Sequence, residues 1–223
     1  MIYPKKEKIR LKKVFCKLCR KEGAKLFFKG ERCFSEKCPI EKVTAVKGRG
    51  RGRGKPGFQK PVKLSEYGRQ LKEKQKVKRM AGLRERQFHS YYMKASKKKD
   101  ATGTMLLSMI ERRVENIVCQ LGFTSSKSQA RQLVVHGHVR VNDNIVDKPS
   151  FQLKVGDKVS LSGKAYEFKF VKDSIEKTKQ RSDVPGYLQL DAEGKVGTVI
   201  ALPTRDDISI PAKEQLIVEL YSK

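Results

Sequence analysis

Four of the chain's five cysteines lie within one short stretch, "CKLCRKEGAKLFFKGERCFSEKC" (residues 16–38), and no other feature constrains the fold as strongly. Cys16 and Cys19 form a C-x2-C pair, 13 residues follow, and Cys33 and Cys38 form a C-x4-C pair. Two such pairs can surround one zinc ion with four thiolates, which leaves no open position for substrate and indicates a structural site. We therefore predict one structural zinc ion held by Cys16, Cys19, Cys33 and Cys38. The alternative is four free thiols in a disordered tail.

A segment this short cannot build a hydrophobic core, whereas structural zinc contributes about 10–16 kcal/mol of apparent binding free energy. Clustered cysteines in a reducing compartment are more often metal ligands than disulfides. The fifth cysteine, Cys119, stands alone in a helical pattern, and we expect it to be a packed thiol with no redox role.

Positive charge is concentrated in the first half of the chain. The formal net charge is +27, and residues 1–100 have 33 basic and 9 acidic side chains against 18 and 15 in residues 101–223. Such an excess repels itself unless a polyanion neutralises it, so we expect nucleic acid as the partner. The chain has no apolar run of the roughly 18–20 residues that span a bilayer, and its start has no apolar signal-peptide centre, so we predict a cytoplasmic protein. A basic transit peptide is the weaker alternative for this start.

Two basic regions follow the cysteines. The stretch "GRGRGRGKPG" (48–57) is too rich in glycine to fold alone. We predict that its Arg49, Arg51 and Arg53 contact the RNA backbone. A solvated linker is the alternative. Residues 65–99 have helical periodicity, with Ser65 as N-cap, an interruption at Gly82, and an aromatic face (Phe88, Tyr91, Tyr92) that is expected in the core rather than stacked on bases. Phosphate contacts are predicted for Lys74, Lys76, Lys78, Arg79, Arg84, Arg86, Lys97, Lys98 and Lys99.

The next region has two helical patterns and then short strands. Residues 104–121 predict one amphipathic helix with Leu106, Ile110, Val114, Ile117 and Leu121 inside. A second helix begins at a capping box of Ser126 and Gln129 and ends at Gly137. Strands and turns are predicted from Val139 to about residue 162. Later, "YLQLD", "TVIAL" and "LIVELY" predict strands, and residues 165–180 are ambiguous between strand and helix.

The stretch "MLLSMIERRVENIVCQLGFTSSKSQARQLVVHGHVRVNDNIVDKPSFQLKVGDKVSL" resembles the alpha-L RNA-binding domain, which occurs in a small-subunit ribosomal protein, some tRNA synthetases and pseudouridine synthases. The cysteine cluster, "LKEKQKVKRMAGLRERQF", "ASKKKDATG" and "ALPTRDDISIPAKEQLIVELYSK" resemble the family of bacterial small-subunit ribosomal protein four, in its zinc-containing form. The resemblance runs from about Cys16 to Lys223. Residues 1–15 and 43–58 depart from the family pattern, so no RNA contact is carried over to them.

The resemblance implies a structural protein that binds the 5′ domain of small-subunit rRNA, nucleates assembly of the body and contributes to translational accuracy. It also implies contacts with mRNA near the entry channel and with neighbouring ribosomal proteins, and neither a membrane nor a small-molecule substrate. In the alpha-L domain, basic outer faces of two helices and nearby polar side chains are expected to contact phosphates and 2′-hydroxyls. These residues are Arg112, Arg113, Ser126, Lys127, Gln129, Arg131, His136, His138 and Arg140. For the two histidines, ordinary surface residues are the alternative.

Two rival functions are excluded or weakened by the residues. An rRNA pseudouridine synthase needs a separate catalytic domain with an Asp in an Arg-Leu-Asp context, and the chain has no such triplet. A zinc-ribbon DNA-binding or heat-shock RNA-binding factor would explain the cysteines and the charge, but not the C-terminal match. We therefore predict a protein that is not an enzyme.

The sequence predicts an α+β protein: a zinc-stabilised N-terminal module and a helical domain, with an inserted alpha-L domain of two helices and a small curled sheet. The predicted segments are a basic extension (1–15), the zinc module (16–42), a Gly/Arg-rich arm (43–63), a helical rRNA-binding region (64–103), the alpha-L domain (104–165) and a C-terminal return (166–223).

Overall fold

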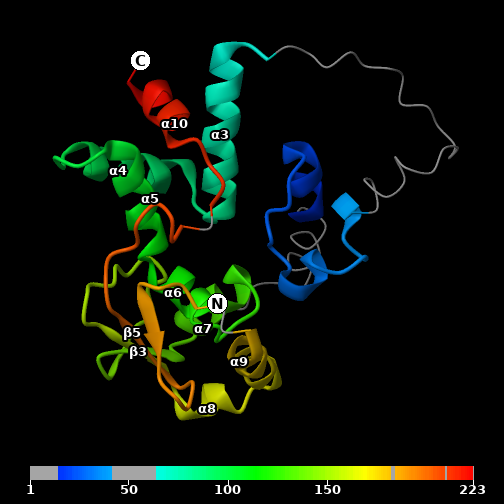
Figure 1. The fold of residues 1–223 in the computed structure, drawn as a ribbon, viewed down its shortest axis with the longest axis vertical. Coiled ribbons are helices and arrows are strands. Elements are labelled where there is room, and N and C mark those ends of the chain that lie inside the picture. Colours follow the sequence, from blue (N-terminus) through cyan, green and yellow to red (C-terminus); the bar gives the residue numbers. More distant parts are fainter. Residues whose placement is uncertain (1–14, 42–63, 182–183, 209, 223) are drawn as a thin grey trace, which may run out of the picture. The chain divides into compact units, whose positions relative to one another are not determined.

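A computed structural model describes residues 15–41, 64–181, 184–208 and 210–222. The chain divides into two compact units: residues 1–82 with 215–223, and residues 83–214 (Figure 1). The predicted extension and Gly/Arg-rich arm, with Arg49, Arg51 and Arg53, lie outside the described residues. The observed mixture of helices with an antiparallel sheet confirms the predicted α+β class.

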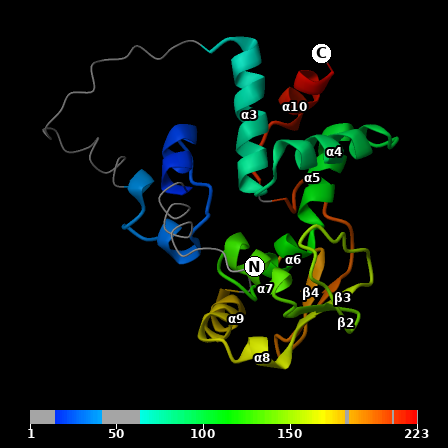
Figure 2. The ribbon, with the colours of Figure 1, turned by 180° about the vertical axis from the view of Figure 1, so that it is seen from behind.

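In the first unit, helix α3 (Glu66–Met80) packs beside α10 (Glu214–Tyr221), as both views show (Figures 1 and 2). Ser65 caps α3 as predicted, because its hydroxyl accepts a hydrogen bond from the backbone N–H of Gly68 at 3.1 Å. The amide of Gln70 donates to a carboxylate oxygen of Glu219 at 3.0 Å. The cysteine segment contains a helix over residues 15–22 and the short 3-10 helix η1 (Gly30–Cys33).

In the second unit, α4 (Glu85–Ser96) and α5 (Thr102–Glu111) pack together and are followed by α6 (Val114–Gln120) and α7 (Lys127–Val135). The predicted inner faces are confirmed, since Phe88, Tyr92 and all five apolar residues predicted inside residues 104–121 are buried. The single helix predicted over 104–121 is wrong, because it breaks at Arg112 and Arg113.

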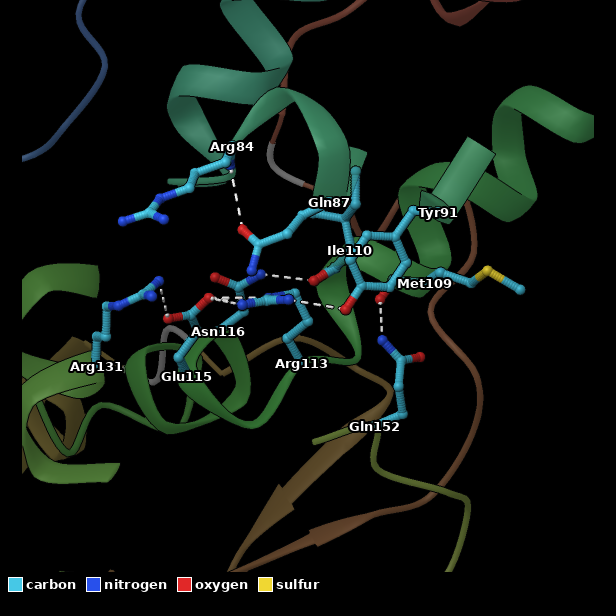
Figure 3. Close-up of polar contacts among 10 residues, drawn as sticks. All are labelled: Arg84, Gln87, Tyr91, Met109, Ile110, Arg113, Glu115, Asn116, Arg131 and Gln152. Atoms are coloured by element: carbon cyan, nitrogen blue, oxygen red, sulfur yellow. Dashed lines mark hydrogen bonds and ion pairs between the residues drawn. The ribbon is translucent and has the colours of Figure 1, made fainter. Parts of the chain in front are cut away.

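The break is caused by a segment distant in the sequence, because residues 112–114 form hydrogen bonds with residues 151–153 instead of continuing the helix. The N–H of Val114 donates to the carbonyl of Phe151 at 2.9 Å, and the N–H of Leu153 donates to the carbonyl of Arg112 at 3.0 Å. Two side-chain amides then satisfy carbonyls at the end of α5: that of Asn116 donates to Ile110 and that of Gln152 donates to Met109, each at 2.7 Å (Figure 3).

Five antiparallel strands form one sheet in the order β2-β1-β3-β5-β4. These are β1 (Val139–Val141), β2 (Asn144–Ile145), β3 (Lys158–Leu161), β4 (Leu188–Leu190) and β5 (Val196–Val199). Asn142 and Asp143 join β1 to β2 in a tight turn, and both have the positive φ angles that such hairpins require. Strands β4 and β5 come from the predicted C-terminal return, so the sheet extends beyond the predicted alpha-L segment.

Helices α8 (Gly163–Tyr166) and α9 (Lys169–Arg181) occupy the stretch that was ambiguous in the sequence. The sheet, α6, α7 and these helices enclose a core of buried apolar side chains, which includes Ile117, Phe123 and Val159. The strands predicted from "YLQLD" and "TVIAL" are present as β4 and, shifted a few residues, β5. The strand predicted from "LIVELY" is wrong, because these residues form α10.

Candidate nucleic-acid interface

The start of α7 is fixed by side chains of the preceding loop. The hydroxyl of Ser126 accepts from the N–H of Gln129, and the Gln129 side-chain oxygen accepts from the hydroxyls of Ser126 and Ser125 at 3.1 and 2.9 Å. The predicted capping box is therefore half present, since the Gln129 oxygen bonds the two hydroxyls rather than the N-cap backbone. This cap sets the register of α7, with Lys127 in its first turn and Arg131 exposed one turn later.

A buried carboxylate holds two of the predicted RNA-binding arginines (Figure 3). Glu115 accepts from Nε and Nη2 of Arg113 at 2.9 and 2.6 Å, and Nη1 of Arg113 donates to the hydroxyl of Tyr91 at 2.7 Å. The other carboxylate oxygen of Glu115 lies 3.3 Å from Nη1 of Arg131. The side chain of Arg113 is 1% exposed and that of Arg131 is 47% exposed. The prediction that Arg113 lies on the basic outer face is therefore wrong, because the helix break turns it inward toward Tyr91.

Arg112 also has a partly structural role. Its Nε donates to the carbonyl of Leu153 at 2.9 Å, and burial lowers the pKa of the Arg112 guanidinium while Asp157 opposes that shift. Arg140 lies exposed on β1, opposite Ser160 of β3. Among the cations predicted in this domain, Arg131 and Arg140 are exposed and Lys127 is half-buried.

The two predicted histidines lie on either side of Gly137, whose φ of +70° lets the chain reverse between α7 and β1. His136 is exposed, and His138 is half-buried with Nδ1 3.3 Å from the hydroxyl of Ser162. Their rings are nearly parallel, 11° apart in plane, with centroids separated by 6.4 Å.

The basic side chains before the alpha-L domain differ in exposure. Arg84, Arg86, Lys97, Lys98 and Lys99 are exposed, as a phosphate-binding surface requires. Lys74, Lys76, Lys78 and Arg79 are half-buried on α3. Lys76 lies 3.7 Å from Glu73, Arg79 forms an ion pair with Glu22, and Lys74 lies over the ring of Tyr221. Acidic side chains therefore pair with two of the cations predicted to contact phosphate, Lys76 and Arg79.

The four clustered cysteines are close enough to influence one another electrostatically. Burial is the main cause that raises the pKa of Cys19 and of Cys33, and the neighbouring thiols raise each of them further. A backbone N–H donates to each of these two sulfurs, from Leu26 to Cys19 and from Lys29 to Cys33, and lowers the pKa in opposition. Over the described ranges, however, no three His, Cys, Asp or Glu side chains are gathered as a group that could hold a metal ion.

Sequence reasoning missed Glu115 and Tyr91, which organise the basic surface from inside. A signal was present, because "RRVE" places an acid two residues after the second of two arginines. It also missed the aromatic pair Phe168 and Phe170, whose rings stack with centroids 5.7 Å apart. Within the described part of the chain, none of the helices is both long and apolar enough to span a membrane.

Known protein families match most of the chain. Residues 10–111 match the family described as ribosomal protein S4/S9 N-terminal domain, and residues 112–159 match the S4 domain. Several proteins named small ribosomal subunit protein uS4 are similar. That of Thermoanaerobacter sp. (strain X514) is 46% identical over 208 residues, covering 93% of this chain and 96% of that protein.

Two further relatives agree. The protein of Koribacter versatilis (strain Ellin345) is 46% identical over 214 residues, which cover 96% of this chain and 99% of the relative. The protein of Desulfitobacterium hafniense (strain DSM 10664 / DCB-2) is 47% identical over 212 residues, which cover 93% and 96%. With both domain families matched in order and relatives aligned along nearly their whole length, the chain belongs to the uS4 family of small ribosomal subunit proteins.

Proposed function

We propose that this chain is a structural protein of the small ribosomal subunit and binds its rRNA in the cytoplasm. The observation that carries the proposal is the fixed basic face of α7, where the Ser126 cap sets the helix and Glu115 holds Arg131 at the surface. A rigid array of cations can match one phosphate geometry, whereas a flexible one attracts any polyanion. The relatives are named for the same subunit. A uS4 protein is a structural RNA-binding protein and not an enzyme.

The resemblance to the family supports further proposals about the rRNA target, the assembly role and the other partners. The rRNA target is the 5′ domain, binding there nucleates assembly of the subunit body, and the protein contributes to translational accuracy. mRNA near the entry channel and neighbouring ribosomal proteins are the further partners. Lysines 97–99 are consecutive exposed cations, so we assign them to general attraction for RNA.

We also propose that Cys16, Cys19, Cys33 and Cys38 hold one structural zinc ion. Three of the thiols are buried, neighbouring thiols raise the pKa of Cys19 and of Cys33, and these two receive backbone N–H hydrogen bonds that stabilise thiolates. The donor set therefore suits zinc chemically. When bound, zinc would cross-link the two ends of residues 16–38.

The test of rRNA binding compares two pairs of substitutions that remove the same charge. Lys127→Gln with Arg131→Gln removes the fixed face without placing a carboxylate beside Glu115. Lys148→Gln with Lys154→Gln removes two exposed lysines of the same unit. Affinities for a transcript of the rRNA 5′ domain and for an unstructured RNA are measured at roughly 0.15–0.3 M salt, where sequence-independent attraction is weakened.

We expect the Lys127/Arg131 pair to lower affinity for the folded transcript by about tenfold or more, because charged hydrogen bonds to phosphate are lost. The Lys148/Lys154 pair should lower affinity for both RNAs slightly and equally. Equal losses on the two RNAs for both pairs would contradict the assignment of α7 as the surface that recognises RNA shape.

A further inference from the structure

One surface pocket of the second unit is lined by aromatic rings, and the phosphate contacts proposed above give these rings no role. It measures about 410 Å³ and is lined by Gln129, Gln132, Leu133, His136, His138, Phe168 and Phe170. This volume is within the range of roughly 300–1,000 Å³ that is typical of small-ligand sites. The pocket is open to solvent, because His136, Gln132 and Phe170 are exposed.

The aromatic rings of the pocket form a continuous series. His136 stacks on His138, the ring of Phe168 meets His138 edge-on with centroids 5.3 Å apart, and Phe168 stacks on Phe170. Phe168 also packs against the core, which fixes its position. Phe170 is in the first turn of α9 and is 38% exposed, so one end of the series presents a ring to solvent.

The remaining lining and the nearby charges indicate the chemistry of an occupant. The amide of Gln132 offers a hydrogen-bond donor and an acceptor. The amide of Gln129 offers its NH2 donors, because its oxygen already accepts from Ser125 and Ser126. Five basic residues and one acidic residue lie within two positions, along the sequence, of a lining residue. They are Lys127, Arg131, Arg140, Lys169, Lys172 and Glu167. An occupant that combines a flat aromatic surface, polar edges and an attached negative charge satisfies all three features.

We propose that this pocket binds one unpaired nucleobase of RNA, stacked on the aromatic series, with its phosphate toward the flanking cations. Unpaired bases are the parts of RNA that proteins stack on aromatic rings and read with amide side chains, since paired bases present no free face. This inference rests on the proposed function and adds to it a contact that depends on single-stranded RNA, beside the phosphate contacts of α7.

The chain contains no tryptophan, which allows a direct test. Phe170→Trp introduces a single reporter whose fluorescence is quenched when a base stacks on it. Phe151→Trp is the matched control, because Phe151 is 41% exposed in the same unit and does not line the pocket. Each variant is titrated with a short single-stranded RNA and with a fully paired duplex of the same length, while binding is followed separately by anisotropy of the labelled RNA.

We expect quenching only for the Trp at position 170 and only with single-stranded RNA. In a second measurement, Phe170→Leu should weaken single-stranded binding by about fivefold or more and leave duplex binding unchanged, because one stacking contact is lost. Phe151→Leu should change neither, and thermal melting verifies that all variants are folded.

Binding by anisotropy without selective quenching at position 170, or equal affinity of Phe170→Leu and wild type for single-stranded RNA, would overturn the pocket and leave the proposed function intact. In that case the rings serve only to pack α9. Absence of binding to every RNA would instead refute the proposed function itself.

Discussion

Residues 15–41 and residues 83–214 are organised by different means. In the first, the buried apolar side chains are Leu26 and three cysteines, while Phe27 and Phe34 are 44% and 67% exposed. In the second, buried side chains of α6 to α9 and of strands β1, β3, β4 and β5 form one continuous core. The first region has too little apolar burial to fold without a cross-link, whereas the second needs none. The sensitivity of each region to substitution should differ accordingly.

The largest effect that we predict is loss of the zinc ion. Cys33→Ser should release the proposed zinc ion, about one per chain, and unfold residues 15–41, because that ion would contribute about 10–16 kcal/mol of apparent binding free energy to the segment. Metal analysis and hydrogen exchange of the full chain measure both consequences, with slow exchange retained in residues 83–214. Cys119→Ser is the control, since it makes the same chemical change outside the cluster. If purified wild-type protein contains no zinc, the proposal that a metal ion stabilises residues 15–41 is wrong.

The next effect concerns the core of the second unit. Phe123→Ala should lower the free energy of unfolding by about 3–5 kcal/mol, because Phe123 is fully buried and its removal leaves a cavity. Phe34→Ala in the cysteine segment should cost less than about 0.5 kcal/mol, since that ring is exposed. Urea unfolding gives both values. Zinc content should be unchanged in each variant, and zinc lost from Phe123→Ala would mean that the two regions do not fold separately.

A smaller effect should follow from neutralising the buried carboxylate. Glu115→Gln keeps an oxygen that can accept from Arg113 but removes the compensating charge, so we expect a loss of about 1–3 kcal/mol in unfolding free energy. Glu176→Gln on α9 removes an exposed acid and serves as the control. If the two variants are equally stable, Arg113 does not depend on Glu115.

The smallest predicted effect is at the cap of α7. Ser126→Ala should destabilise the second unit by about 1 kcal/mol, because the N–H of Gln129 loses its side-chain acceptor and keeps only the carbonyl of residue 126. Ser125→Ala removes a neighbouring hydroxyl that only reaches the Gln129 side chain and should have less effect. If thermal melting shows a larger loss of stability for Ser125→Ala than for Ser126→Ala, the contact with the Gln129 side chain, and not the backbone cap, fixes the start of the helix.

Much of the second unit could be predicted because its signals are local. Hydrophobic periodicity gave the buried faces of α4 to α7, and the Asn142–Asp143 turn marked the hairpin. The break at Arg113 could not be predicted, because its cause is pairing with residues 151–153, far along the sequence. The same contact turned Arg113 inward. The apolar run in "LIVELY" was too short to distinguish strand from helix, and packing beside α3 settled it.

The pairing of α3 with α10 also bears on the order of events during synthesis. Domains generally fold as they leave the ribosome, N-terminal parts first. Here Gln70 and Lys74 of α3 find Glu219 and Tyr221 only after the whole of residues 83–214 has been made. The second unit can therefore complete its core while α3 still lacks its neighbour. A chain truncated after residue 214 should keep residues 83–214 protected from proteolysis and leave α3 open to cleavage.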